Sequence, residues 1–258
     1  MIFDEGVFLG SGGSMGVPLP GCACAVCGSK DKKNNRLRPS FFMKMGGKNI
    51  LIDVSPDFRQ QALRRGISKI DAVFLSHTHF DHSGGVEDLR VFSYLQKGPI
   101  PIYCTQESSR DLKKRFDYLF SLRGLAIIET KILDKEPGEF SFAGERVEYY
   151  HYRQMGMKVT GFKIGSFAYV TDISDFDEGI YAFLKGVDSL VVSARNEEKC
   201  FVHKKAHLTV NEAVEFGRRA GVKKLYLNHL SHDIEHSVDE KKLPDFAHFA
   251  FDGMKILG

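Results

Sequence analysis

The chain has 258 residues, enough to bury a large hydrophobic core in one large domain or two small ones. Lys and Arg number 36 against 33 Asp and Glu, and the resulting net charge of +3 is too small to argue for nucleic-acid binding. The first residues carry an acidic pair and no long apolar segment, which argues against a secretory signal, and no apolar run approaches the ~20 residues of a membrane span.

Apolar strand patterns alternate with helical patterns along the chain, and several hairpins lie between them. Strands are predicted at 40–45, 49–54, 70–76, 100–104, 139–152, 159–171, 189–193 and 224–227. Helices are predicted from Ser55-Pro56 to Gly66, at 86–96, 107–120 and 179–185, and from the capping box Thr209-Val-Asn-Glu212 to just before Gly221. This order predicts a mixed α/β sandwich, not a purely parallel sheet.

A cluster of metal-ligand residues directly follows the predicted strand 70–76. It reads His77-Thr-His79-Phe-Asp81-His82, so three imidazoles and a carboxylate lie within six residues. His is the commonest metal ligand and Asp adds a hard oxygen, a mixture that suits Zn²⁺, Mn²⁺ or Fe²⁺ better than Ca²⁺. Because the whole chain has ten His, a chance cluster on a surface loop is a poor alternative to a metal site.

Three further potential ligands also stand at strand ends. Asp53 ends the strand at 49–54, Asp172 follows the strand at 159–171, and His229 follows the strand at 224–227. Each alone has an ordinary explanation as a cap or a surface residue. Their repeated placement predicts that one edge of the sandwich gathers them into a single site.

The cysteines indicate a second metal site. Five Cys is an odd count, and Cys22, Cys24 and Cys27 form a C-x-C-x-x-C pattern that favours a metal knuckle in a reducing, cytoplasmic compartment. A structural Zn²⁺ needs a fourth ligand, for which His232 is the first candidate and His236 the competing one. The isolated residues Cys104 and Cys200 are expected to be buried or inert thiols.

The motif His77-x-His79-x-Asp81-His82 and its ordered partners resemble the metallo-β-lactamase superfamily across nearly the whole chain. The resemblance implies an α/β (α+β) fold: a four-layer αββα sandwich of two mixed sheets flanked by helices. It would form one domain over 1–258, with an inserted zinc knuckle near 21–28.

The resemblance also implies a dinuclear metal site between the sheets. One metal would be bound by His77, His79 and His151, the other by Asp81, His82 and His229, and Asp172 would bridge the two. Asp53 would orient a ligand or a bound water by hydrogen bonds. His151 has an alternative place, because in Tyr149-Tyr-His-Tyr152 it can pack among aromatic side chains of a hairpin.

The Gly-rich stretch at 9–18, the Cys knuckle and the segment 228–232 are similar to one branch of this superfamily, the PhnP-like cyclic phosphodiesterases of phosphonate pathways. That branch implies hydrolysis of a small phosphodiester by a hydroxide bound to two Zn or Mn ions, beside one structural Zn. It gives His207 the role of general acid, and Asp81 and Asp53 complete the expected catalytic set. Candidate phosphate contacts are Arg195 and Lys204, while His203 and His248 are expected to be surface or packing residues.

Two other functions remain open. The segment 206–209 is also similar to tRNA 3′-end processing endoribonucleases, although the chain has no long Gly- and Lys-rich arm to hold tRNA. A non-catalytic accessory protein like the PQQ-pathway member of the superfamily would share the Cys knuckle. The expected partner is a small phosphodiester, with nucleic acid less favoured, no membrane, and a homodimer as the ordinary state of a soluble enzyme. Lactamase, glyoxalase and sulfatase activities stay open as well, because the fold does not fix the substrate.

Overall fold

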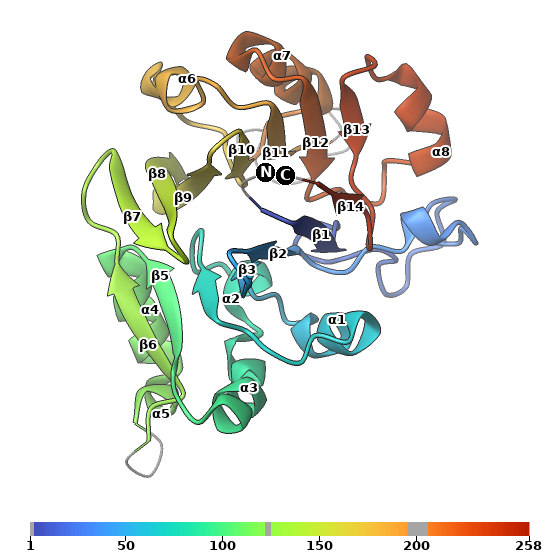
Figure 1. The fold of residues 1–258 in the computed structure, drawn as a ribbon. Helices are drawn as coiled ribbons and strands as arrows, with labels where there is room; N and C mark the ends of the chain where they lie inside the picture. Colours follow the sequence, from blue (N-terminus) through green and yellow to red (C-terminus); the bar gives the residue numbers. More distant parts are fainter. Residues whose placement is uncertain (1–2, 122–124, 196–205, 258) are drawn as a thin grey trace.

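The computed structural model describes residues 3–121, 125–195 and 206–257, in which two seven-stranded sheets face each other (Figure 1). The first sheet has the order β14-β1-β2-β3-β4-β5-β6. Its strands are β1 Glu5–Gly10, β2 Ser40–Met45, β3 Lys48–Ile52, β4 Ala72–Phe74, β5 Ile100–Cys104, β6 Ile128–Ile132 and β14 Lys255–Ile256. The second sheet has the order β13-β12-β11-β10-β9-β8-β7. Its strands are β7 Gly138–Phe142, β8 Glu145–Gln154, β9 Met157–Ile164, β10 Phe167–Val170, β11 Ser189–Ser193, β12 Lys224–Asn228 and β13 Ala247–Phe249.

Both sheets are mixed in the same way. In the first, β14 to β3 pair antiparallel and β3 to β6 pair parallel. In the second, β7 to β10 pair antiparallel and β10 to β13 pair parallel. Because parallel strands end at one edge of their sheet, the loops after β3, β4, β10, β11 and β12 can meet there.

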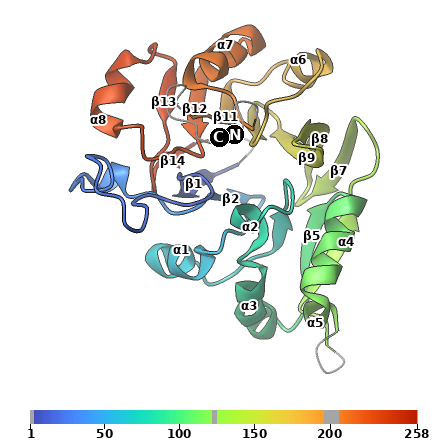
Figure 2. The same ribbon diagram turned by 180° about the vertical axis from the view of Figure 1, so that it is seen from behind.

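Helices cover the two outer faces (Figures 1 and 2). The first sheet carries α1 Phe58–Arg65, α3 Leu89–Gln96 and α4 Gln106–Arg115, and the second carries α6 Gly179–Phe183 and α7 Val210–Ala220. Short helices complete the chain: α2 Phe80–Ser83, α5 Asp117–Phe120, α8 His236–Asp239, η1 Lys32–Asn34, η2 Val86–Asp88 and η3 Glu240–Lys242. The four-layer sandwich predicted from the sequence is confirmed. None of the helices in the described part of the chain is long and apolar enough to cross a membrane.

The inner faces of the sheets are held together by aromatic side chains. Phe74 on β4 packs against Phe162 on β9 with ring centroids 5.5 Å apart, and Phe41 on β2 lies 5.7 Å from Tyr169 on β10. All four side chains are buried in one cluster shared by both sheets. Large rings bury the most area per residue, so this layer fixes the spacing of the strands whose ends carry the polar residues.

Several predicted elements have different bounds in the structure. The first helix begins at Phe58 and not at Ser55, because the Ser55 N–H donates to Ser40 Oγ on β2 and Asp57 is paired with Arg38. The helix predicted at 107–120 is broken at Phe116, whose backbone (φ −132°, ψ 39°) is not helical, and the one predicted at 86–96 starts as a 3₁₀ turn. The strands β1, β6, β13 and β14 were not predicted.

Gly85, at the end of the histidine motif, permits the close contact between this motif and the loop after β3. A Cβ atom on Gly85 would lie 2.1 Å from the Ser55 carbonyl oxygen. This oxygen belongs to the backbone, so it could move away only if the loop after β3 were distorted. We expect Gly85→Ala to lower the free energy of unfolding by about 1–3 kcal/mol in urea denaturation. Gly98→Ala is the matched control, since its Cβ would meet nothing within 4 Å. Equal losses in the two variants would contradict this account.

Candidate metal centre

Four parallel strands deliver the polar residues to one edge of the sandwich, as the sequence predicted. Asp53 follows β3, the histidine motif follows β4, Asp172 follows β10 and His229 follows β12. Asp53, Asp172 and His229 all have left-handed backbone, with φ of 62°, 54° and 63°. Such conformations cost roughly 1–3 kcal/mol each in non-glycine residues and persist where the surrounding structure imposes them, often at functional sites.

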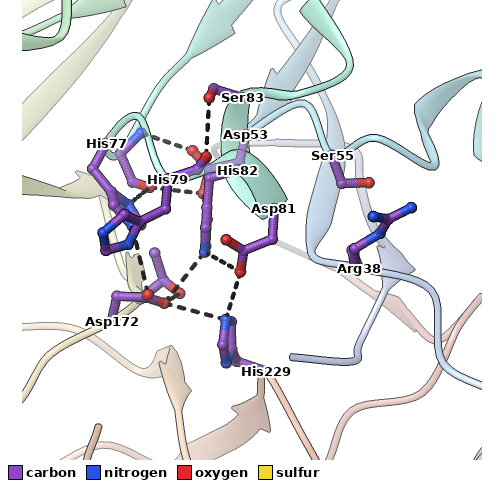
Figure 3. Close-up of polar contacts among 12 residues, drawn as sticks. Arg38, Asp53, Ser55, His77, His79, Asp81, His82, Ser83, Asp172 and His229 are labelled. Atoms are coloured by element: carbon purple, nitrogen blue, oxygen red, sulfur yellow. Dashed lines mark hydrogen bonds and ion pairs between the residues drawn. The ribbon is translucent and has the colours of Figure 1, made fainter. Parts of the chain in front are cut away.

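The carboxylate of Asp172 connects the two parts of the site, and dashed lines in Figure 3 join it to His77, His82 and His229. Its Oδ1 is 3.4 Å from His82 Nε2 and 3.7 Å from His229 Nε2. Its Oδ2 faces the other way and lies 3.5 Å from His77 Nε2. The two oxygens therefore face two different groups of nitrogen ligands, which is the arrangement of a carboxylate that bridges two cations.

On the Oδ1 side, Asp81, His82 and His229 form one group. Asp81 Oδ2 lies 3.1 Å from His229 Nε2 and 3.3 Å from His82 Nε2 (Figure 3). Within the described residues His82 Nε2 is buried and has no hydrogen-bond partner. Its other nitrogen, Nδ1, lies 2.7 Å from Asp53 Oδ2. A carboxylate at Nδ1 fixes the ring so that the Nε2 lone pair points into the group, as in many metal-binding histidines.

On the Oδ2 side, His77 and His79 stand together. His77 Nε2 and His79 Nδ1 are 2.9 Å apart, and His77 Nδ1 is 3.0 Å from Ser76 Oγ. The Ser76 hydroxyl in turn donates to Asp53 Oδ2 at 2.8 Å. Asp53 therefore supports both halves of the site, directly through His82 and through Ser76 on the side of His77.

The charges of the site favour cation binding. Burial alone would raise the pKa of Asp172, but the neighbouring His229 and His82 rings hold it well below its usual range. The pKa of Asp81 is likewise lowered, against its burial, by His82 and His229. Both carboxylates are therefore ionised at neutral pH, the form in which they bind metals.

His207 also lies at this edge. Its ring centroid is 4.5 Å from that of His229, and one of its ring nitrogens groups with a carboxylate oxygen of Asp172 and a ring nitrogen of His229. Burial lowers the pKa of His207 to about 4. The predicted phosphate contact Arg195 follows β11, its N–H donates to the Leu208 carbonyl beside His207, and its positive charge also lowers the pKa of His207. The other candidates Lys204 and His203, and Cys200, lie outside the described residues, while His248 is a surface residue paired with Glu240.

The structure does not bring His151 to this site, which corrects the expected ligand set. Its Nδ1 lies 3.1 Å from Thr160 Oγ1, its Nε2 lies 3.2 Å from the Leu133 carbonyl, and its ring packs against Tyr149. His151 therefore takes the second position considered from the sequence, packed among aromatic side chains of a hairpin. Three residues further along β8, Gln154 reaches the site instead: its Nε2 donates to Asp172 Oδ2 at 3.0 Å. Sequence reasoning missed Gln154, whose only signal was a polar residue just before a Met-Gly turn.

The cysteines form a second group with His232. Their Sγ atoms lie 3.4, 3.5 and 3.6 Å from His232 Nδ1, for Cys22, Cys24 and Cys27 in that order. Ligands of one tetrahedral zinc, with bonds of about 2.0–2.3 Å, stand roughly 3.5 Å apart, so the four atoms fit one ion. His236, the competing fourth ligand, is not in this group, since its ring is buried against Phe251.

The thiols of the knuckle differ in acidity. The backbone N–H of Cys27, with His232 and the other thiols, lowers the pKa of Cys24 to about 6, whereas burial raises that of Cys27 to about 11. Burial also raises the pKa of Cys104 to about 12, as expected for an inert core thiol.

Buried clusters of His and Asp at the edge of an αββα sandwich define a class of metal-binding proteins, and comparisons with known proteins identify the family. The Beta-lactamase superfamily domain matches residues 48–230, and the chain belongs to the metallo-β-lactamase superfamily. A solved structure of a diphosphatase from the PhnP family is 34% identical, with a TM-score of 0.89 over 98% of this chain and 96% of that one. Zn²⁺-bound PqqB from Methylobacterium extorquens shares the fold at 18% identity, with a TM-score of 0.77 over 98% and 99% of the two chains.

A curated relative extends beyond the length of this chain. The octanoyltransferase of Porphyromonas gingivalis (strain ATCC BAA-308 / W83) is 34% identical over 257 residues, which are 97% of this chain but 51% of that protein. The chain thus spans about half the length of this relative.

Proposed function

We propose that this protein is a metal-dependent phosphodiesterase that hydrolyses a small phosphodiester, with cyclic phosphates included in this class. The observation that carries the proposal is Asp172, whose two oxygens face two separate groups of buried nitrogen and oxygen ligands. The similarity to a PhnP-family diphosphatase over nearly the whole chain supports hydrolysis at phosphorus.

The residues fit two divalent cations. His77, His79 and Asp172 would hold one, and Asp81, His82, His229 and Asp172 the other. Two such cations lower the pKa of a water molecule and stabilise the negative charge that develops on the phosphoryl oxygens. The protein's part is to hold the ligands rigidly, which the hydrogen bonds of Asp53 to Ser76 and His82 do.

In this proposal His207 acts on the leaving oxygen. It lies against His229, on the loop that precedes the capping box of α7. The box fixes the start of this helix, because Thr209 Oγ1 accepts from the Glu212 N–H and Glu212 accepts from the Thr209 N–H. His207 is thereby held beside the ligands Asp172 and His229. Its pKa is about 4 in the free protein, and a phosphate anion bound at the two cations would raise it, so that His207 would carry the proton that it donates to the departing oxygen.

The test of this function is an activity screen of metal-loaded protein against bis(p-nitrophenyl) phosphate, cyclic ribose phosphates, diphosphate diesters and precursor tRNA. The expected result is the release of an alcohol and a phosphomonoester from open-chain diesters, and the opening of cyclic phosphates to phosphomonoesters. Cleavage of tRNA alone, with tight and salt-sensitive RNA binding, would reject the proposal in favour of an endoribonuclease.

His207→Ala is expected to act through the leaving group. With an alkyl leaving group the variant should lose about 10²–10³-fold in kcat, because the departing alkoxide needs a proton. With p-nitrophenolate, which leaves without one, the loss should stay under about tenfold. His248→Ala, a surface substitution, is the control and should change neither rate. Equal losses of the His207 variant on both substrates would argue against proton donation.

A further inference from the structure

Gln154 is a buried amide at the end of a hairpin. It is the last residue of β8, and the turn to β9 consists of Met155 and Gly156, both with positive φ (47° and 86°). Such a two-residue turn matches the twist of the two strands and fixes where the residue before it points. The side chain of Gln154 is 2% exposed, so its polar atoms need partners inside the protein.

The nitrogen of this amide has two acceptors. Nε2 donates to Asp172 Oδ2 at 3.0 Å and to the Ala206 carbonyl at 2.8 Å, so both N–H groups are used. If the amide group were turned over, its oxygen would face the two acceptor oxygens of Asp172 and Ala206, and two oxygens without a proton between them repel. Oε1 is therefore the remaining atom, and within the described residues it is buried without a hydrogen-bond partner.

Gln154 lies in the half of the centre that lacks a ligand. It contacts Asp172 Oδ2, the oxygen that faces His77, and not Oδ1, which faces His82 and His229. The half around His82 has four protein donors, Asp81, His82, His229 and Asp172. The half around His77 has three, His77, His79 and Asp172, because His151 is hydrogen-bonded elsewhere.

We propose that Gln154 completes this half through its amide oxygen, and that Oε1 binds a divalent cation together with His77, His79 and Asp172. The inference rests on the two-metal centre of the proposed function. An amide oxygen is a neutral, hard donor, and oxygen donors suit Mn²⁺ and Mg²⁺ better than a third imidazole does. The centre is therefore asymmetric. The ion near His77 is held less tightly than the ion near His82, and the site near His77 has a stronger preference for Mn²⁺ over Zn²⁺ than the site near His82.

The experiment is a titration of Mn²⁺ into protein that carries zinc only on its cysteines, followed by calorimetry and by the electron paramagnetic resonance of coupled Mn²⁺ ions. Two Mn²⁺ ions should bind to the parent protein. Gln154→Leu is expected to lower the affinity for one Mn²⁺ ion by about tenfold or more and to leave the affinity for the other unchanged. Gln154→Glu should retain or raise the affinity for this ion, since the oxygen donor remains. Gln154→His should raise the affinity of the same half for Zn²⁺.

The Glu variant separates a ligand from a positioning residue. A glutamate at position 154 cannot donate to Asp172 and Ala206, so a purely positioning role predicts the same loss for Gln154→Glu as for Gln154→Leu. That result would overturn the inference. Thermal unfolding of each variant shows whether the fold is retained.

His151→Gln is the matched control and should leave both Mn²⁺ affinities unchanged. If it weakened one ion while Gln154→Leu did not, His151 would be the ligand and the inference would be wrong. Two Mn²⁺ ions bound equally by the parent and by Gln154→Leu would reject the role of Gln154 alone. Absence of any Mn²⁺ from the parent would reject the two-metal centre, and the proposed function with it.

Discussion

Asp172→Asn is expected to reduce the hydrolysis of bis(p-nitrophenyl) phosphate by at least about 10³-fold, a loss of about 4 kcal/mol of transition-state stabilisation. The substitution keeps the shape of the side chain but removes its negative charge. It also places an NH₂ group where a carboxylate oxygen now faces His77 or His82. Two cations brought close together repel each other, and a neutral amide offsets this repulsion much less than a bridging carboxylate.

Initial rates and bound metal should be measured on the same samples. Asp188→Asn is the control, because this carboxylate lies on the surface, paired with Lys223 where β11 and β12 begin, and the site lies beyond the other ends of these parallel strands. It should keep the parent's rate and metal content. If Asp172→Asn retained both, Asp172 would not be a bridging ligand, and the catalytic centre would have to lie elsewhere.

The positions of the site at strand ends could be predicted because they depend on a simple rule. Parallel strands end at one edge, so Asp53, Asp172 and His229 had to meet the histidine motif once the two sheets were packed. The choice of His232 as the partner of the cysteines followed from its spacing of three residues after His229, and the structure groups it with them. These predictions needed only strand order and spacing.

The contrast between His151 and Gln154 shows what the sequence could not supply. The direction of a side chain near a hairpin depends on the turn, and here the Met155-Gly156 turn places Gln154 at the site while His151 stays among the inner aromatics. Residue type favoured His151, because imidazole is the commoner ligand. The missed edge strands have a related cause: β14 has two residues, and its pairing with β1 depends on contacts far apart in the sequence.

The knuckle and the metal centre are connected by a short rigid segment. Between His229 and His232, the Leu230 N–H donates to the Ser11 carbonyl and the Gly13 N–H donates to the Leu230 carbonyl. The fully buried Arg36 donates to the Ser231 carbonyl at 2.8 Å. A shift of His232 would therefore reach His229 through the two residues between them, and we expect the thiolate site to support the geometry of the other centre.

We therefore expect Cys24→Ser to have a large effect on both stability and activity. Loss of one thiolate should release the metal at the knuckle, because a hydroxyl is a poor ligand for zinc, and the segment around 22–27 contains no helix or strand to hold it in place. Structural zinc contributes folding free energy directly. We expect the melting temperature to fall by about 10 °C or more, the metal content to fall by one ion, and hydrolysis to decline as His229 loses its support.

Cys104→Ala is the matched control, since this thiol is buried in the core away from the knuckle and should cost stability without loss of metal. Metal analysis and thermal unfolding distinguish the two variants. Addition of a strong chelator to the parent should lower the melting temperature at least as much as Cys24→Ser does, because the chelator removes the knuckle ion together with the ions of the other centre. A Cys24→Ser protein with the parent's metal content and melting temperature would show that the three thiols and His232 do not hold a metal.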